Sequence, residues 1–142
     1  MIAQPATLVA VLALLAPATE TAVSSQVMTP QWERLPSSAT LDELFPPLAR
    51  QYRIGGRTWM RCSVTDDGKL QGCAVIKEIP ENQGFGDAAL RSVRYFKMTP
   101  TVRGIPVKGG TVIIPIVWQT DDGAKAPPIP PDFNPATNPS AP

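Results

Sequence analysis

The stretch that decides the fold runs Cys62-Ser63-Val64-Thr65-Asp66-Asp67-Gly68-Lys69-Leu70-Gln71-Gly72-Cys73. It contains the only two cysteines of the chain, set symmetrically about an Asp-Asp-Gly-Lys turn and flanked by residues that suit β-strands. A hairpin in which paired residue numbers sum to 135 (62 + 73) places Cys62 opposite Cys73. A three-residue loop, Asp66–Gly68, would instead send the two side chains to opposite faces. A bond between the cysteines would therefore select the first register.

The first register makes two further predictions about the hairpin. Its loop runs from Asp66 to Lys69 and is closed by Thr65 and Leu70, which leaves the cysteines at a non-hydrogen-bonded position, where side chains approach most closely. Because structural disulfides are rare in the cytosol, such a bridge indicates an oxidising compartment. The alternative is a pair of buried free thiols that act as small hydrophobic side chains.

The amino terminus has the features of an export signal. Residues Ala6 to Ala16 form an uncharged apolar run that is too short to span a bilayer, and Ala16-Pro17-Ala18 offers an Ala-x-Ala cleavage site. We therefore expect a signal peptide over residues 1–18. Met1–Pro5 carries no Lys or Arg, so two alternatives stay open: the true start lies upstream, with a longer anchor, or the run is a buried helix of the domain.

Several classes of functional site are not expected. The chain contains no histidine, which removes the commonest general base and the usual zinc ligand. Gly84-Phe85-Gly86 and Gly109-Gly110 are too short for phosphate-binding loops. Asp66 and Asp67, beside a glycine, are typical of turn formers rather than of a calcium or acid–base pair. We expect no catalytic residues, no metal and no cofactor, and hence not an enzyme.

The charge of the chain is unevenly distributed. The net charge is +1, yet Arg50 to Lys108 holds eleven Lys/Arg against five Asp/Glu, a difference of +6. No basic run is interleaved with aromatic residues, so nucleic acid is not an expected partner.

The remaining pattern predicts a small domain between a linker and a tail. Residues 19–40 are expected to be a linker, residues 41–120 a folded domain, and residues 121–142 a Pro-rich, extended, disordered tail. Within Leu41–Tyr52, Pro46-Pro47 predicts a helix that begins at the prolines. Further elements are predicted from periodicity: strands at Arg57–Thr65, Leu70–Ile79 and Thr111–Gln119, and a helix at Asp87–Met98.

This order predicts an α+β fold, a small antiparallel sheet of about three strands with two helices packed on one face. The last strand contains Pro115, which cannot donate to a ladder, so one side of that strand is expected to be unpaired there. The residues expected in the core are Met60, Val64, Val75, Ala89, Leu90, Val93, Phe96, Ile114 and Ile116.

The order and spacing of several short motifs resemble the C-terminal domain of TonB, from about Leu44 to Gln119. The similarity begins with Phe45-Pro46, Ala49 and Gly56 and continues through the Asp67-Gly68 turn. It ends with Ala88-Ala89-Leu90-x-x-Val93, Phe96-x-x-x-Pro100, Gly104-x-Pro106-Val107 and Val112-Ile113-Ile114-Pro115-Ile116-Val117-Trp118. The cysteine-bearing hairpin resembles a subgroup of these domains that has paired cysteines at usually apolar positions.

The resemblance implies a periplasmic binding domain that adds an extended segment of an outer-membrane receptor to a sheet edge. The residues that match the recognition edge are those of the last strand, Thr111, Val112, Ile113, Ile114, Pro115, Ile116, Val117, Trp118 and Gln119. TonB couples to a proton-driven motor through a membrane helix that carries a Ser and a His. The absence of histidine and of a full-length span leads us to expect recognition without coupling.

Two functions are therefore expected as alternatives. The first is an exported module that pairs with a strand of an envelope protein, with a TonB-dependent outer-membrane receptor as one candidate and a homodimer through edge strands as another option. The second is a structural or wall-associated envelope protein that keeps the fold without strand capture, its basic Arg50–Lys108 region facing anionic polymers. The location is the periplasm, with anchoring in the inner membrane if the amino-terminal segment is not cleaved.

Overall fold

The computed structural model describes residues 29–135. The expected signal peptide, residues 19–28 of the expected linker and residues 136–142 lie outside this range. In chain order the elements are β1 (Trp32–Arg34), α1 (Ser38–Leu44), α2 (Pro47–Gln51), β2 (Gly56–Val64), β3 (Leu70–Ile79), α3 (Phe85–Ser92), the 3₁₀ turn η1 (Val93–Tyr95), β4 (Lys97–Met98), β5 (Thr101–Val102), β6 (Ile105–Pro106) and β7 (Thr111–Trp118).

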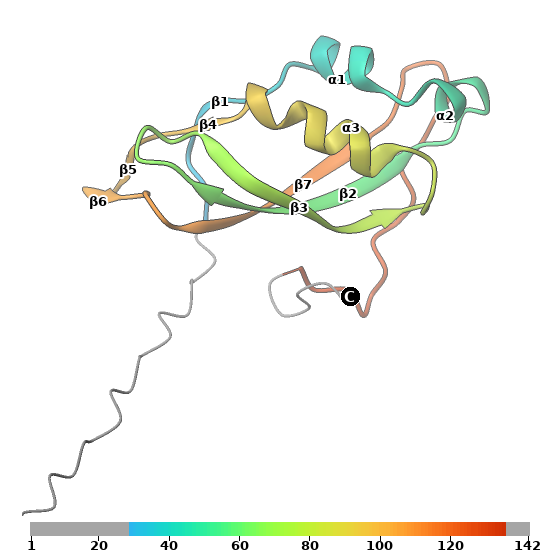
Figure 1. Ribbon diagram of the computed structural model, residues 1–142. Coiled ribbons are helices and arrows are strands. Elements are labelled where there is room, and N and C mark those ends of the chain that lie inside the picture. Colours follow the sequence, from blue (N-terminus) through green and yellow to red (C-terminus); the bar gives the residue numbers. More distant parts are fainter. Residues whose placement is uncertain (1–28, 136–142) are drawn as a thin grey trace, which may run out of the picture.

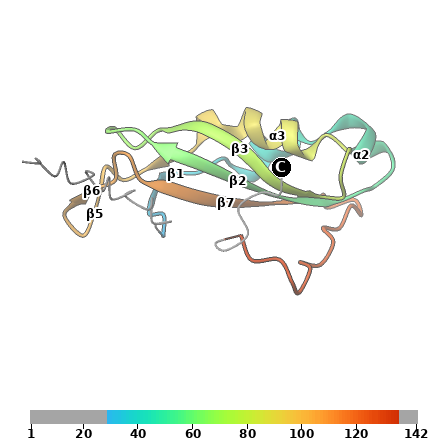
Figure 2. The ribbon, with the colours of Figure 1, turned by 60° about the horizontal axis from the view of Figure 1, so that its bottom comes forward.

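The main sheet has three antiparallel strands in the order β3-β2-β7. Figure 1 shows α1 and α3 on one side of this sheet, and Figure 2 shows the segment after β7 on the other. Two short pairs, β1 with β4 and β5 with β6, lie at one end. The α+β fold is thus the expected one. Within residues 29–135, no helix combines the length and the apolar character needed to cross a bilayer.

The β2–β3 hairpin differs from the expected register at its tip. Thr65 N–H donates to the Lys69 carbonyl (2.8 Å) and Gly68 N–H to the Thr65 carbonyl (3.1 Å), so the loop has three residues, Asp66–Gly68, and is closed by Thr65 and Lys69. Gly68 takes φ +84, as the last residue of such a loop requires. The predicted four-residue loop closed by Thr65 and Leu70 is therefore wrong.

A β-bulge brings the cysteines back to one face despite the shorter loop. Gly72 and Cys73 together lie opposite Cys62, since the register shifts between Arg61↔Ala74 and Ser63↔Gln71. Gly72 adopts φ +59, which glycine tolerates at the first position of a bulge. The extra residue reverses the side-chain alternation of β3, so the argument that a three-residue loop separates the cysteines does not hold for a bulged strand.

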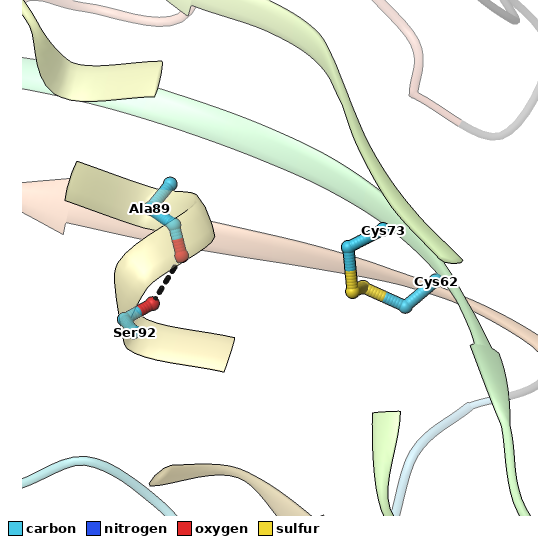
Figure 3. Close-up of a disulfide and its surroundings, with 4 residues drawn as sticks. All are labelled: Cys62, Cys73, Ala89 and Ser92. Atoms are coloured by element: carbon cyan, nitrogen blue, oxygen red, sulfur yellow. Dashed lines mark hydrogen bonds between the residues drawn. A yellow bond between two sulfur atoms is a disulfide. The ribbon is translucent and has the colours of Figure 1, made fainter. Parts of the chain in front are cut away.

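The disulfide itself is confirmed. Cys62 and Cys73 are bonded, with their Cα atoms 4.1 Å apart, and Figure 3 shows the bridge on the side of the sheet where α3 carries Ala89 and Ser92. Cys62 is fully buried in the core, and Cys73 is partly buried and packs against the core. The bridge thus takes the place of an apolar cross-strand pair between β2 and β3.

The main helix begins earlier and ends sooner than expected. Its buried side is formed by Phe85, Ala88, Ala89 and Ser92, a spacing of three and four residues typical of one helix face. The Ser92 hydroxyl is satisfied by donating to the Ala89 carbonyl (2.6 Å), so a polar residue can lie on this face. The prediction that Leu90 is in the core is wrong: the side chain is 41% exposed, because it lies off this stripe.

The other predicted core positions pack on the inner side of the sheet. Val75 and Val93 are partly buried against the core. The buried members of the predicted set are Met60, Val64, Ala89, Phe96, Ile114 and Ile116. An aromatic cluster that the prediction lacked completes the core: Phe85 lies 5.6 Å from Phe45 and 6.1 Å from Trp118, measured between ring centroids.

The segment expected to be a linker contains structure over its described part. Ser37 caps α1, its hydroxyl accepting from the Thr40 N–H (3.1 Å). Trp32 of β1 lies 5.2 Å from the ring of Phe96. Burial of this aromatic side chain ties the segment to the domain. The helix expected at the prolines is confirmed as α2, which begins at Pro47.

The described part of the tail also differs from the unpacked chain that its composition predicts. Ala124 is buried, and Lys125 forms a parallel bridge with Ile54. Farther along, Phe133 lies edge-on to Trp59 at 4.6 Å between centroids. The segment is extended and rich in proline, but it packs across the sheet face opposite the helices (Figure 2) because Trp59 offers an aromatic surface there.

Candidate functional site

The predicted partner-binding residues, Thr111 to Gln119, form β7 and the residue after it. β7 has eight residues and pairs with β2 from Thr111↔Ser63 to Trp118↔Gly56. It is an outer strand of the sheet, and within residues 29–135 no strand pairs with its other side. The structure thus places the whole predicted stretch along one sheet edge.

The hydrogen-bonding direction of β7 follows from its register. Val64 N–H donates to the Gly110 carbonyl (3.0 Å), and in an antiparallel ladder every second pair from there is a hydrogen-bonded pair. The backbone hydrogen bonds between β7 and β2 are therefore expected at three pairs of the register: Val112 with Cys62, Ile114 with Met60 and Ile116 with Thr58.

The odd-numbered residues of β7 direct their backbone groups to the outer edge. Pro115, opposite Trp59, occupies such a position, so its missing N–H removes no bond to β2. The outer edge offers N–H groups at Thr111, Ile113 and Val117, and carbonyls at these residues and at Pro115. Of the four outward residues of β7, only Pro115 lacks an N–H donor, so the other backbone groups of this edge remain available to pair with an added strand.

The inner face of β7 is held rigidly by the core. Val112, Ile114, Ile116 and Trp118 are buried. The Trp118 indole N–H donates to the hydroxyl of Thr58 on β2 (3.0 Å), and both groups are buried. A pre-formed strand lowers the ordering cost of binding, because only the partner loses backbone freedom.

The outer end of β7 adjoins a shallow hollow. Val117 is 43% exposed, and the hollow between the end of β7 and α1 has a volume of about 460 Å³. Its lining includes Leu41 and Phe45 as apolar residues and Asp42 and Asp121 as acidic ones. Asp42 is paired with Arg50 at 2.8 Å. This end of the edge can therefore receive a side chain of an added strand.

Over its described residues, 119–135, the segment after β7 does not pair with the outer edge of β7 and crosses the sheet face instead. Its described contacts are with Ile54 in the loop before β2, with Arg57 and Trp59 of β2 and with Lys77 of β3. None of these contacts is a strand pairing with β7. The Arg57 Nε donates to the Pro127 carbonyl (2.5 Å). The open edge and the covered face are thus different surfaces of the sheet.

Asp67 of the hairpin has a structural role in the turn. The Thr65 hydroxyl donates to Asp67, and this bond lowers the pKa of the Asp67 carboxyl against an opposing effect of desolvation, while the nearby Lys69 charge adds a smaller lowering. Thr65 also accepts from the Lys69 N–H (3.0 Å). Both sets of contacts stabilise the three-residue loop, as expected for turn formers.

Sequence reasoning identified β7 as the edge but missed what surrounds it. The hollow beside Val117 depends on α1, whose only local signal is the Ser37 cap. The tail contacts depend on Phe133, an isolated aromatic residue in a Pro-rich segment. Neither signal indicates by itself which face of the sheet the segment covers.

The family match covers nearly the same residues as the folded domain expected over residues 41–120. The family model described as the Gram-negative bacterial TonB protein C-terminal matches residues 43–120, more than half of the 142 residues. No curated protein sequence matches the chain.

Two solved structures are similar to the chain at low identity. The solution structure of the Pseudomonas aeruginosa TonB C-terminal domain has 18% identity and a TM-score of 0.45, over 54% of this chain and 77% of that one. The TonB2 protein of Vibrio anguillarum has 18% identity and a TM-score of 0.40, over 82% of this chain and 97% of that one. On the family match, the chain belongs to the TonB C-terminal family, whose periplasmic domains take part in envelope transport and receptor interaction.

Proposed function

We propose that this protein is an exported, periplasmic interaction module that captures an extended segment of an envelope protein along the outer edge of β7. The observation that carries the proposal is the register of β7: its outward backbone groups at Thr111, Ile113 and Val117 have no strand partner within residues 29–135. Family membership supports an envelope partner, and a segment of a TonB-dependent outer-membrane receptor is the first candidate. A homodimer through β7 would use the same groups.

Strand addition draws its affinity from main-chain hydrogen bonds and its specificity from alternate side chains. The exposed side chains of Pro115 and Val117 would contact the partner, and the hollow at the end of β7 would receive one of its side chains. The proposal concerns recognition of the partner and does not extend to energising transport.

The direct test is a proline substitution at an outward backbone group. Val117→Pro removes an N–H that faces the edge and leaves the bonds to β2 in place, because proline is tolerated on the outer side of an edge strand. Val117→Ala is the matched control, since it shortens the same side chain and keeps the N–H. The probes are labelled peptides that cover the amino-terminal periplasmic segments of TonB-dependent receptors from the same species.

We expect saturable binding to the native protein, retained within about twofold by Val117→Ala and weakened about tenfold by Val117→Pro, as the loss of one main-chain hydrogen bond implies. Thermal unfolding of both variants checks that the fold is intact. Equal affinities for the two variants would exclude pairing at this edge. If no receptor peptide binds the native protein, the structural role in the envelope replaces strand capture.

A further inference from the structure

A second hollow lies on the helix side of the sheet, away from the β7 edge. It has a volume of about 740 Å³ and is formed by the end of β1, the start of β3, the carboxyl-terminal half of α3 and η1. We call it the cationic pocket. Its apolar residues are Leu70, Leu90, Val93 and Phe96, and its charged residues are Arg34, Lys69, Arg91 and Arg94. None of them belongs to β7.

The charges of the cationic pocket are only partly compensated. Lys69 lies 3.5 Å from Asp67, and the Arg94 guanidinium donates to the Tyr95 hydroxyl (3.0 Å) and lies over its ring. Arg34 and Arg91 form no ion pair within residues 29–135. Among the described residues, three arginines therefore share one concave surface with no carboxylate paired with any of them, which favours an anionic ligand.

The floor of the same pocket is apolar and accessible. Leu70 and Phe96 are buried, Val93 is half-buried, and Leu90 is 41% exposed. A single exposed leucine is common on protein surfaces. Here it lies inside a concave site that it lines together with Leu70, Val93 and Phe96. The pocket thus fits a ligand that is both anionic and apolar.

The hollow continues along the groove between α3 and β3, where the charge changes sign. A third hollow, of about 490 Å³, shares Leu90 with the cationic pocket and is also lined by Val75, Glu78 and Asp87. Glu78 accepts from the Gly86 N–H (2.6 Å), whereas Asp87 is exposed. A groove with cations at one end and carboxylates at the other fits an extended peptide better than a uniformly anionic membrane surface.

We propose that the cationic pocket is a docking site for an acidic segment of a partner protein, with its carboxylates between Arg34, Arg91 and Arg94 and an apolar side chain on Leu90. Arginine suits this task because its planar fork binds carboxylates in a bidentate manner. The site is separate from the β7 edge, so its test does not depend on strand capture. A variant such as Val117→Pro should leave it unchanged.

The test uses a short fluorescein-labelled peptide of alternating glutamate and leucine, with a glutamine–leucine peptide of equal length as its neutral counterpart. Fluorescence anisotropy measures the affinity of each at low and high salt. We expect the glutamate peptide to bind more tightly, and salt to weaken it. The double variant Arg91→Glu, Arg94→Glu should bind it about tenfold or more weakly, because like charges then face each other.

Three variants separate the pocket from general effects of charge. Lys125→Glu reverses a single charge at an exposed residue outside the pocket and should change affinity by less than about twofold, since distant surface charges are screened. Leu90→Gln tests the apolar floor and should weaken binding. Arg91→Gln, a milder change, guards against misfolding of the double variant, and near-ultraviolet circular dichroism checks all of them.

Two results would overturn the proposal. One is an affinity for the glutamate peptide that the Arg91 and Arg94 substitutions leave unchanged. The other is the absence of peptide binding together with arginine-dependent binding to phosphatidylglycerol vesicles, which would make this surface a membrane contact.

Discussion

The contact between Phe133 and Trp59 tests how the carboxyl-terminal segment is held. Trp59 points away from the helices yet is only 4% exposed, with the Phe133 ring edge-on at 4.6 Å and Lys77 5.3 Å from that ring. Phe133→Ala removes an aromatic pair worth about 0.5–1.5 kcal/mol. It also removes a cation–π contact worth about 0.5–1 kcal/mol. We expect a loss of about 1–2.5 kcal/mol, which lowers Tm by about 4–8 °C per kcal/mol in a domain of this size.

The assay combines thermal unfolding with tryptophan fluorescence. Phe133→Ala should expose Trp59 to water, so its emission should shift to longer wavelength and become more accessible to acrylamide. The same substitution made in a Trp59→Phe background should leave the remaining emission unchanged, which assigns the signal to Trp59. Ile129→Ala is the matched control within the segment, since Ile129 is 51% exposed. An unaltered Tm and unaltered emission for Phe133→Ala would refute the packed position of residues 120–135.

Two further predictions concern the hairpin. Replacing Cys62 and Cys73 together by alanine should lower the free energy of unfolding by about 2–3 kcal/mol on the chain-entropy model for a loop of this length; equal denaturant midpoints for the native and double-alanine proteins would contradict it. Because the Thr65 hydroxyl lowers the pKa of Asp67, the carboxylate stabilises the folded state above the pKa that Asp67 has when unfolded, and this contribution is lost as the pH falls through the lower folded pKa. A carbon-detected NMR titration should show the lowered pKa, and Thr65→Val should raise it; a titration that Thr65→Val leaves unmoved would rule out the hydroxyl as the cause.

Periodicity and turn chemistry were sufficient for the sheet but not for its irregularities. The strands and the disulfide could be predicted because the alternation of β2 and β7 is regular and the two cysteines are unique. The bulge at Gly72 could not, because a glycine in a strand signals a bulge without stating which way the register shifts. The hairpin shows the consequence: the loop was predicted one residue too long, and the bulge preserved the correct pairing of the cysteines.

The helix shows a different limit. The predicted core included Leu90 because of its place in the apolar periodicity of Asp87–Met98, whereas the buried face uses Ser92 with its hydroxyl bonded within the helix. The helix was expected to begin at Asp87, but it begins at Phe85, whose side chain is fully buried. Local hydrophobicity cannot distinguish a core residue from one that lines a pocket. The cationic pocket was therefore out of reach from sequence, although two of its arginines, Arg91 and Arg94, were counted in the basic region.

The structure also changes how that basic region should be understood. Its excess of +6 suggested a surface that could face anionic polymers, but several of its cations have other contacts. Arg50, Lys69 and Lys97 are paired with carboxylates. Arg57 and Lys77 contact the carboxyl-terminal segment on the opposite face. Arg91 and Arg94 of this region join Arg34 in the cationic pocket, and this concentration of charge beside α3 argues for a defined acidic ligand rather than for diffuse attraction to a polymer.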